Sequence, residues 1–230
     1  MNGTGVLNGV SGPLPPKLGK QSEVGLKNSL LGGKFTGTLS YFDVRQLNNT
    51  LPSVPFDPAN PNVLIPGVIS RGFDGDASFQ ATKNLYLIGS FSWFKAKSVL
   101  GPAAASFVQP YYRTVVTGSI PDNNTAQHAL RALALYRFTQ GSQRGLDVGL
   151  GIDYQSKKAV TDSANQVMFG YLPERTIVNA NAVYTVSKRL KYSLNVDNLF
   201  NRRYLYSARN ANQIVTGDPI NIKLGVTYSR

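Results

Sequence analysis

The residues best suited to binding a ligand stand together in the longest predicted loop, from Ser98 to Ala126. Tyr111, Tyr112 and Arg113 offer two aromatic surfaces and a permanent cation at consecutive positions. This combination suits an anionic, ring-bearing ligand, which it can hold by cation–π contacts and charge pairing. The alternative is that these side chains belong to an aromatic belt or to the packing of the loop itself.

Few other residues could do chemistry. The sequence has no cysteine and one histidine, His128, so no His/Cys metal cluster can form and a nucleophile–histidine–acid triad has little support. Asp74 and Asp76 share one face of a predicted strand, where paired carboxylates are commonly just solvated. Gly149-x-Gly151 continues into strand alternation without a following helix, which argues against a dinucleotide-binding loop. We expect no enzyme activity, no metal site and no cofactor.

Alternation of apolar and polar residues predicts the elements that position these side chains. In residues 146–155, Leu, Val, Leu, Ile and Tyr occupy one face and Asp, Gly, Gly, Asp and Gln the other. The pattern predicts about nine strands. The clearest are about 9–11 residues long, a length that crosses a bilayer when the strand is tilted. The predicted strands are Ser22–Leu31, Lys34–Leu47, Ile69–Ala81, Leu85–Lys97, Gln127–Thr139, Leu146–Lys157, Thr176–Val186, Leu190–Leu199 and Ile220–Ser229.

Short and long connections alternate between these strands. The short ones are 32–33, 82–84, 140–145 and 187–189, and the long ones are 48–68, 98–126, 158–175 and 200–219. Tight turns at one end and long loops at the other are typical of an outer-membrane meander. The predicted fold is therefore all-β, an antiparallel up-and-down transmembrane β-barrel, present here as a partial barrel.

The direction of the apolar face separates a membrane barrel from a soluble one, because it meets lipid in the first and a packed core in the second. The polar rows contain Asp, Asn, Lys and Gly, which suit a hydrated lumen. The apolar rows often carry an aromatic residue towards one end, as an interfacial girdle would: Tyr154, Tyr184, Trp93 and Tyr228. Both observations favour lipid.

The net charge is +12, with 24 Lys and Arg against 12 Asp and Glu, which raises the alternative of a soluble, basic nucleic-acid-binding β protein. That alternative requires clustered cations and base-stacking aromatic residues on one sheet face. The cations instead stand singly or in pairs, so we expect no nucleic-acid partner. Contact with lipid and lipopolysaccharide of an anionic outer leaflet is an intermediate interpretation. Arg202 and Arg203 either bind lipopolysaccharide phosphate or are solvated.

The end of the chain carries a recognisable motif. Asn198-Leu199-Phe200, followed by Tyr204, ends a predicted strand and resembles the penultimate-strand signature of TonB-dependent receptors. After it, Gly217-Asp218-Pro219 resembles the Gly-x-Pro-Arg that opens the last strand of that family, with Ile220 in place of Arg. The chain ends in Tyr-Ser-Arg, whereas the family usually ends on an aromatic residue.

Motifs in the first half of the chain resemble the same family. The segment 22–27, which contains Glu23, Gly25 and Lys27, is similar to a mid-barrel motif of siderophore receptors. The segment 70–74, with Arg71 and Gly72, resembles the family's Ser-Arg-Gly-Val-Glu, and residues 123–128 stand where the family often has Asn-x-Pro-x-His. These motifs follow the family's order across nearly the whole chain.

The resemblance implies that residues 1–230 are the C-terminal part of a TonB-dependent receptor barrel, without plug domain or signal peptide. The full-length receptor imports ferric siderophores across the bacterial outer membrane and is energised by TonB through the missing N-terminal region. About nine strands are well under half of the roughly 22 in such a plugged barrel. The two open sheet edges, which lipid does not tolerate, indicate a fragment.

The family's C-terminus is periplasmic, so the short turns are expected in the periplasm and the long loops outside. In the family the chelate is held by outer loops, lumen wall and plug, which makes an iron chelate the ligand expected at Tyr111, Tyr112 and Arg113. The alternative is another outer-membrane barrel, porin-like or structural, without energy coupling.

Overall fold

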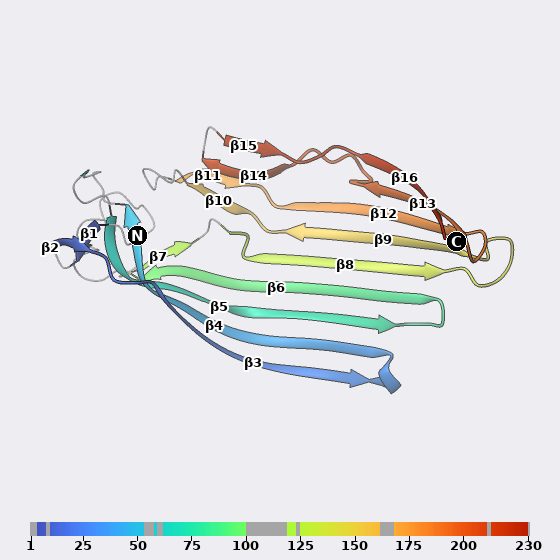
Figure 1. Ribbon diagram of the computed structural model, residues 1–230, viewed down its shortest axis with the longest axis horizontal. Coiled ribbons are helices and arrows are strands. Elements are labelled where there is room, and N and C mark those ends of the chain that lie inside the picture. The colour runs from blue at the N-terminus through green and yellow to red at the C-terminus, as the bar shows by residue number, and fades with distance from the viewer. Residues whose placement is uncertain are drawn as a thin grey trace.

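The chain forms a twisted sheet whose long strands lie side by side along the molecule (Figure 1). The computed structural model describes residues 4–7, 10–52, 58, 62–99, 119–122, 125–161, 168–210 and 213–229. One short 3-10 helix, η1 (Leu31–Gly33), joins two of the strands. Within these described ranges, no helix has both the length and the apolar character that crossing a bilayer requires.

Nine antiparallel strands make up the body of the sheet, and each pairs with its neighbours in chain order. They are β3 (Leu18–Leu30), β4 (Phe35–Pro52), β5 (Asn62–Gln80), β6 (Leu85–Val99), β8 (His128–Arg137), β9 (Leu146–Gln155), β12 (Arg175–Thr185), β13 (Leu190–Asp197) and β16 (Asn221–Tyr228). All nine predicted strands are confirmed. In the described part of the chain, the edge strands β3 and β16 each pair with one neighbour only.

The first four of these strands are longer than the sequence pattern predicts. They have 13, 18, 19 and 15 residues, and the pairing of β4 with β5 continues as far as Pro52 and Asn62, inside a segment predicted as loop. Hydrogen bonds between strand backbones form whether or not the strands contact lipid, so the paired strands can extend beyond the membrane. Apolar alternation has no reason to continue there, and the pattern therefore underestimates the length.

Shorter strands lie before the first long strand and in three of the segments that were predicted as loops. They are β1 (Thr4–Leu7), β2 (Val10–Pro13), β7 (Ser119–Asp122), β10 (Lys158–Thr161), β11 (Met168–Leu172), β14 (Leu205–Asn210) and β15 (Gln213–Thr216). β10 pairs with β11 and β14 with β15, so two of the long connections contain hairpins. β7 extends the ladder at the loop end of β6.

The strand register places an apolar face across all nine long strands. One row across the sheet contains Leu26, Leu39, Gly75, Phe91, Leu130 and Tyr154, and another contains Leu150, Ala180, Val196 and Ile222. Large side chains on this face are open to the surroundings, with Leu26 68% and Leu224 82% exposed. An apolar surface of this extent is unfavourable in water and favourable in lipid.

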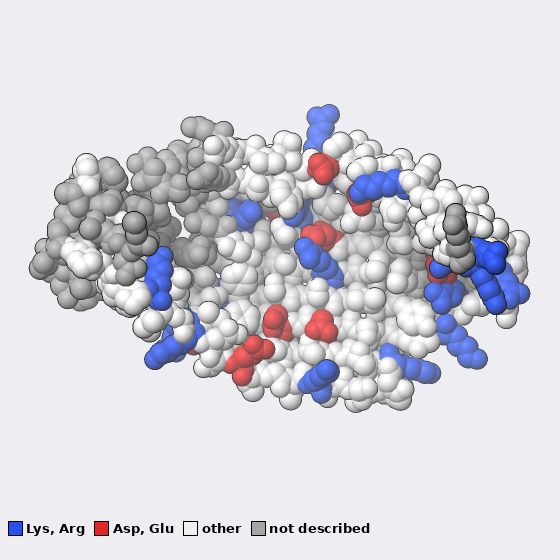
Figure 2. Space-filling model, viewed as in Figure 1, with Lys and Arg blue, Asp and Glu red and all other residues white. Residues whose placement is uncertain are grey.

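The opposite face of the sheet is mixed: it has apolar side chains such as Ile88 and Leu133, and it also carries polar residues and cross-strand ion pairs. Figure 2 shows acidic and basic side chains over the middle of the strands. The pairs here are Arg131–Asp153 at 2.9 Å, Arg137–Asp147 at 3.0 Å and Lys223–Asp197 at 2.8 Å. This pattern fits the hydrated lumen wall of a barrel.

Aromatic side chains border the apolar face at both ends of the strands. Near the long loops, the Phe73 ring lies 5.1 Å from Tyr41 and 5.8 Å from Trp93, which in turn lies 6.2 Å from His128. Of the predicted girdle residues, Trp93 and Tyr154 lie in or beside this row. Tyr184 and Tyr228 lie at the other end, with the short turns and the C-terminus (Figure 1). The apolar band is therefore bounded by two girdles.

Candidate functional site

The predicted ligand-binding residues Tyr111, Tyr112 and Arg113 lie outside the described residues, so that assignment stays a prediction. The described segments hold no group of three or more His, Cys, Asp or Glu side chains that could bind a metal ion. The described residues that could contact a ligand lie instead on the polar face, at the loop end of the sheet.

The motif residues Glu23, Gly25 and Lys27 lie on β3 and share its polar side. Gly25 packs closely against the neighbouring strand, because a Cβ added there would lie 2.7 Å from the Ser40 hydroxyl oxygen. Glu23 accepts a hydrogen bond of 3.2 Å from the Gln21 amide. These three residues lie apart from the loop-end site, on the first of the nine strands.

Arg71 and Gly72 are neighbours on β5 but face opposite sides of the sheet. A Cβ on Gly72 would lie 2.2 Å from the carbonyl oxygen of Trp93 and 2.4 Å from the Cβ of Phe94. Only glycine allows β5 and β6 to approach this closely. Arg71 is on the apolar side, beyond the aromatic row, where its Nε donates to Asp43 at 2.6 Å.

Asn198 forms a buried connection at the base of the last long loop. Its side chain is 3% exposed, and its Nδ2 donates to the carbonyl oxygens of Arg202 and Asp218, each at 2.9 Å. Its Oδ1 accepts from the Arg202 backbone N–H at 2.9 Å, and its own backbone N–H donates to Asn179 Oδ1 at 2.9 Å. One amide side chain thus joins the start of the loop to its end, beside strand β12.

The turn around Asn198 depends on residues that tolerate a left-handed backbone. Asn198 and Asn201 have φ values of 52° and 49°, a region that asparagine enters more readily than most residues. Asn201 Oδ1 accepts from the Ile220 backbone N–H at 3.0 Å, and the Leu199 N–H donates to the Val178 carbonyl at 2.7 Å. Phe200, in contrast, is 74% exposed.

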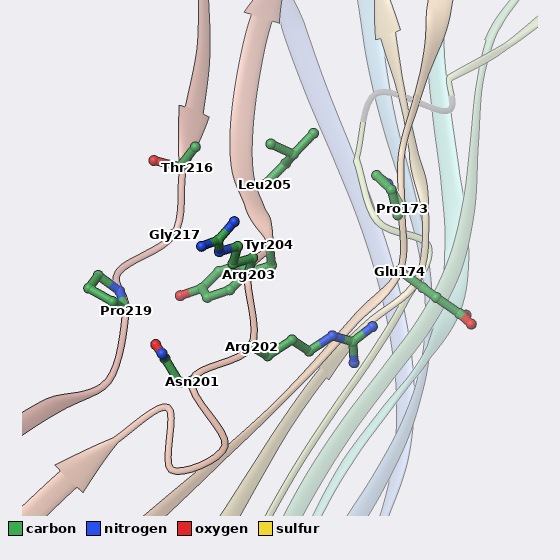
Figure 3. Close-up of a pocket in the computed structure, with 10 residues that line it drawn as sticks. All are labelled: Pro173, Glu174, Asn201, Arg202, Arg203, Tyr204, Leu205, Thr216, Gly217 and Pro219. Carbon is green, nitrogen blue, oxygen red and sulfur yellow. The ribbon is translucent and has the colours of Figure 1, made fainter.

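Tyr204 and Gly217 come together across the same loop. The Gly217 N–H donates to the Tyr204 carbonyl at 2.8 Å, and a Cβ on Gly217 would lie 2.0 Å from the tyrosine ring. Figure 3 shows the ring pointing towards Gly217 and Pro219, while Arg202 extends the other way. These side chains line a pocket of about 530 Å³. The absence of a side chain at Gly217 is what lets the ring lie against the returning backbone.

Arg175 brings the loop onto the polar face of the sheet. Its guanidinium carbon lies 5.1 Å from the ring centre of Tyr204 and 4.9 Å from that of Tyr206, so the cation contacts two aromatic faces. This arrangement was not predicted from the sequence. The available signal was the Tyr204-x-Tyr206 spacing, which places both rings on one side of an extended segment at the start of β14.

A polar cavity of about 320 Å³ opens beside this cluster. Its charged lining residues are Arg131, Asp153, Arg175, Asp197 and Asp218. Two buried atoms here, Arg175 Nε and Asp153 Oδ1, have no hydrogen-bond partner among the described residues. Unsatisfied buried groups are rare in folded proteins, so this donor and this acceptor are available to a ligand or a water molecule.

The described residues of the site are suited to binding and form no catalytic constellation. A fixed guanidinium, two phenol rings and carboxylates can hold a polar ligand by ion pairing, hydrogen bonds and stacking. The motif residues Asn198, Tyr204, Gly217 and Pro219 surround the base of this site and hold its loop in place.

A family model described as TonB dependent receptor-like, beta-barrel, matches residues 2–199. The chain belongs to this family. The metal-pseudopaline receptor CntO of Pseudomonas aeruginosa is 29% identical over 217 residues, which cover 93% of this chain and 28% of that receptor. The chain thus spans about a quarter of the length of this relative.

Solved structures of TonB-dependent receptors have the same strand arrangement. The ferripyoverdine receptor of the Pseudomonas aeruginosa outer membrane superposes with a TM-score of 0.73 at 19% identity, covering 94% of this chain and 28% of the receptor. The closed form of Fiu, the ferric-catecholate import receptor of E. coli, superposes with a TM-score of 0.74 at 20% identity, covering 99% of this chain and 30% of that receptor. These similarities confirm the predicted β-barrel fold.

Membership of the TonB-dependent receptor family gives the two faces of the sheet their surroundings. The protein is an outer-membrane β-barrel protein, so its apolar face meets lipid and its polar face belongs to the lumen wall. The cavity beside Arg175 and the loop anchored by Asn198 are therefore on the lumen side of a TonB-dependent receptor barrel, near its long loops.

Proposed function

We propose that this chain is the C-terminal part of the barrel of a TonB-dependent receptor that imports a ferric siderophore or a similar metal chelate. The observation that carries the proposal is the match of residues 2–199 to the receptor barrel family. The names of the relatives support the substrate class, since they include a metal-pseudopaline receptor and a ferripyoverdine receptor. The chain itself would have no enzymatic role.

The cavity beside Arg175 supports a role for the lumen wall in holding the chelate. Siderophores and their complexes carry oxygen donors and often aromatic rings, which match a guanidinium flanked by Tyr204 and Tyr206. Arg175 Nε and Asp153 Oδ1 would supply a hydrogen-bond donor and an acceptor. Tyr111, Tyr112 and Arg113 would add contacts from the longest loop.

Energy coupling would involve TonB, acting on a plug domain and TonB-contacting region elsewhere in the receptor. The test is uptake of radiolabelled iron by cells that express the full open reading frame containing this chain, in a strain deleted for its other receptors. Pseudopaline, pyoverdine, a catecholate and citrate are the chelators to compare. We expect saturable uptake of one class, abolished by loss of TonB.

The alternative, a porin-like barrel, gives a different result in this assay. Uptake through a passive pore would be non-saturable and independent of TonB, which would refute the proposal. Within the receptor, Arg175→Gln should lower affinity for the chelate. Arg144→Gln, which removes the same charge in a turn at the opposite end of the barrel, should leave it unchanged. Equal effects of the two variants would exclude the cavity as a chelate contact.

A further inference from the structure

A cluster of cations lies on the lipid-facing side of the sheet, beyond the aromatic row at the loop end. We call this the outer cationic cluster; its members are Lys20, Arg45, Arg71, Lys95 and Lys97. All five are exposed and stand on four adjacent strands, β3 to β6. These five cations are separated by up to 77 positions along the chain, so they look scattered in the sequence.

The strand register brings the cluster together in two rows. In the row next to the aromatic residues, Asp43 stands opposite Arg71, and Arg71 opposite Lys95. In the next row outward, Lys20 stands opposite Arg45, and Ile69 separates Arg45 from Lys97. Adjacent strands are about 4.8 Å apart, so side chains from several strands can reach one multivalent anion.

Asp43 orients two of the cations. One carboxylate oxygen accepts from Arg45 Nε at 2.8 Å and the other from Arg71 Nε at 2.6 Å. These bonds fix the guanidinium groups and leave Arg71 with both terminal nitrogens free of any other partner among the described residues. Lys95 and Lys97 have no ion pair in the described ranges. With five cations and one carboxylate, the cluster has a net charge of +4.

The cluster borders a hollow of about 760 Å³ on the lipid-facing surface. Its lining combines Arg71, Lys95 and Lys97 with the aromatic rings of Phe73 and Trp93. A surface with cations on the outer side and aromatic rings on the membrane side matches the boundary between a lipid head group and its acyl chains.

A second hollow, of about 450 Å³, lies on the same strands further into the apolar band. Gly37, Ala77, Gly89 and Ala132 follow one another across β4, β5, β6 and β8 in one row. Because their side chains are small, this row is lower than the rows on either side, which include Phe91 and Leu130. An acyl chain fits a depression of this kind.

We propose that the outer cationic cluster and the hollows below it bind lipopolysaccharide of the outer leaflet. The arginines and lysines hold its lipid A phosphates, and the small-residue row receives one acyl chain. Lipopolysaccharide carries several phosphates close together, which matches a cluster of charge +4 better than the single phosphate of a phospholipid does. Guanidinium groups fixed in advance by Asp43 lose little entropy when they bind a phosphate. This proposal needs only the outer-membrane position and is independent of chelate transport.

The experiment measures lipopolysaccharide bound to the receptor, expressed from its full open reading frame and purified in mild detergent. Native mass spectrometry counts the lipids retained, and titration with purified lipid A gives an affinity. The variant is Lys95→Gln/Lys97→Gln, and the matched control is Lys83→Gln/Lys188→Gln, which removes two cations from turns at the other end. We expect affinity to fall about tenfold in the first variant only.

Two further titrations identify the chemistry. Lipid A without its phosphates should bind at least about tenfold more weakly than intact lipid A, and phosphatidylglycerol should not compete with it. Equal binding of dephosphorylated lipid, equal competition by phosphatidylglycerol, or equal loss in the two lysine variants would each overturn the proposal. If the double variant does not fold, Lys97→Gln alone serves, because this exposed lysine has no ion pair among the described residues.

Discussion

Replacing Asn198 by glycine tests whether one amide holds the base of the last loop. Glycine tolerates the left-handed backbone at this position, where φ is 52°, so the change removes the side chain without straining the turn. Three side-chain hydrogen bonds are lost, two to Arg202 and one to Asp218. Each hydrogen bond contributes about 1 kcal/mol, so the loop should lose about 3 kcal/mol of local stability.

Hydrogen–deuterium exchange of the receptor reports this local stability directly. A loss of about 3 kcal/mol corresponds to opening that is roughly a hundredfold more frequent, so amides in peptides covering 199–220 should exchange roughly a hundredfold faster. Amides in the middle of β8 and β9 should keep their wild-type rates, because their ladder is unaffected.

The matched control is Asn201→Gly. Asn201 has the same left-handed backbone, with a φ of 49°, but its side chain makes one hydrogen bond among the described residues, to Ile220. This variant should lose about 1 kcal/mol and exchange about fivefold faster. If the two variants exchange at the same rate, or if Asn198→Gly behaves as wild type, the reasoning about Asn198 is wrong.

Two further predictions concern packing and lipid exposure. Gly217→Ala puts a methyl group 2.0 Å from the Tyr204 ring, so the ring must move. Thermal unfolding should show a loss of about 1–3 kcal/mol in stability. The same change in a Tyr204→Ala background should show no such loss, because the ring is absent. Leu224 is 82% exposed on the lipid-facing side, so Leu224→Lys places a charge in lipid. This change should lower the stability of the folded barrel by about 2–4 kcal/mol. Ser193→Lys, on the polar face beside it, should assemble normally, and equal assembly of both lysine variants on a heat-modifiability gel would contradict the assignment of faces.

The membrane part of the fold could be predicted from the sequence because lipid imposes a simple rule. Every second residue between the two girdles meets lipid, so β9 and β16 show clean alternation that marks their bounds to within a few residues. Outside that band the rule does not apply. The hairpins β10–β11 and β14–β15, and the extension of β4 to Pro52, are stabilised by contacts that have no period in the sequence.

The candidate site was predicted less completely. The resemblance singled out Asn198, Tyr204 and Gly217, but their contacts with one another depend on a loop that returns to its starting point. The contact of Arg175 with Tyr206 joins segments about 30 residues apart across two elements, and no local pattern encodes it. Spacing indicated which residues are unusual, and only the folded chain indicates their partners.

The anchor at Asn198 also bears on how such a protein can change over generations. Because the amide closes the loop at Arg202 and Asp218, the start of β16 is held in position whatever the residues between them do. Insertions, deletions and substitutions in the hairpin 205–216 can therefore accumulate without disturbing assembly of the last two strands. The same boundary marks where a loop from a related receptor could be exchanged into this one.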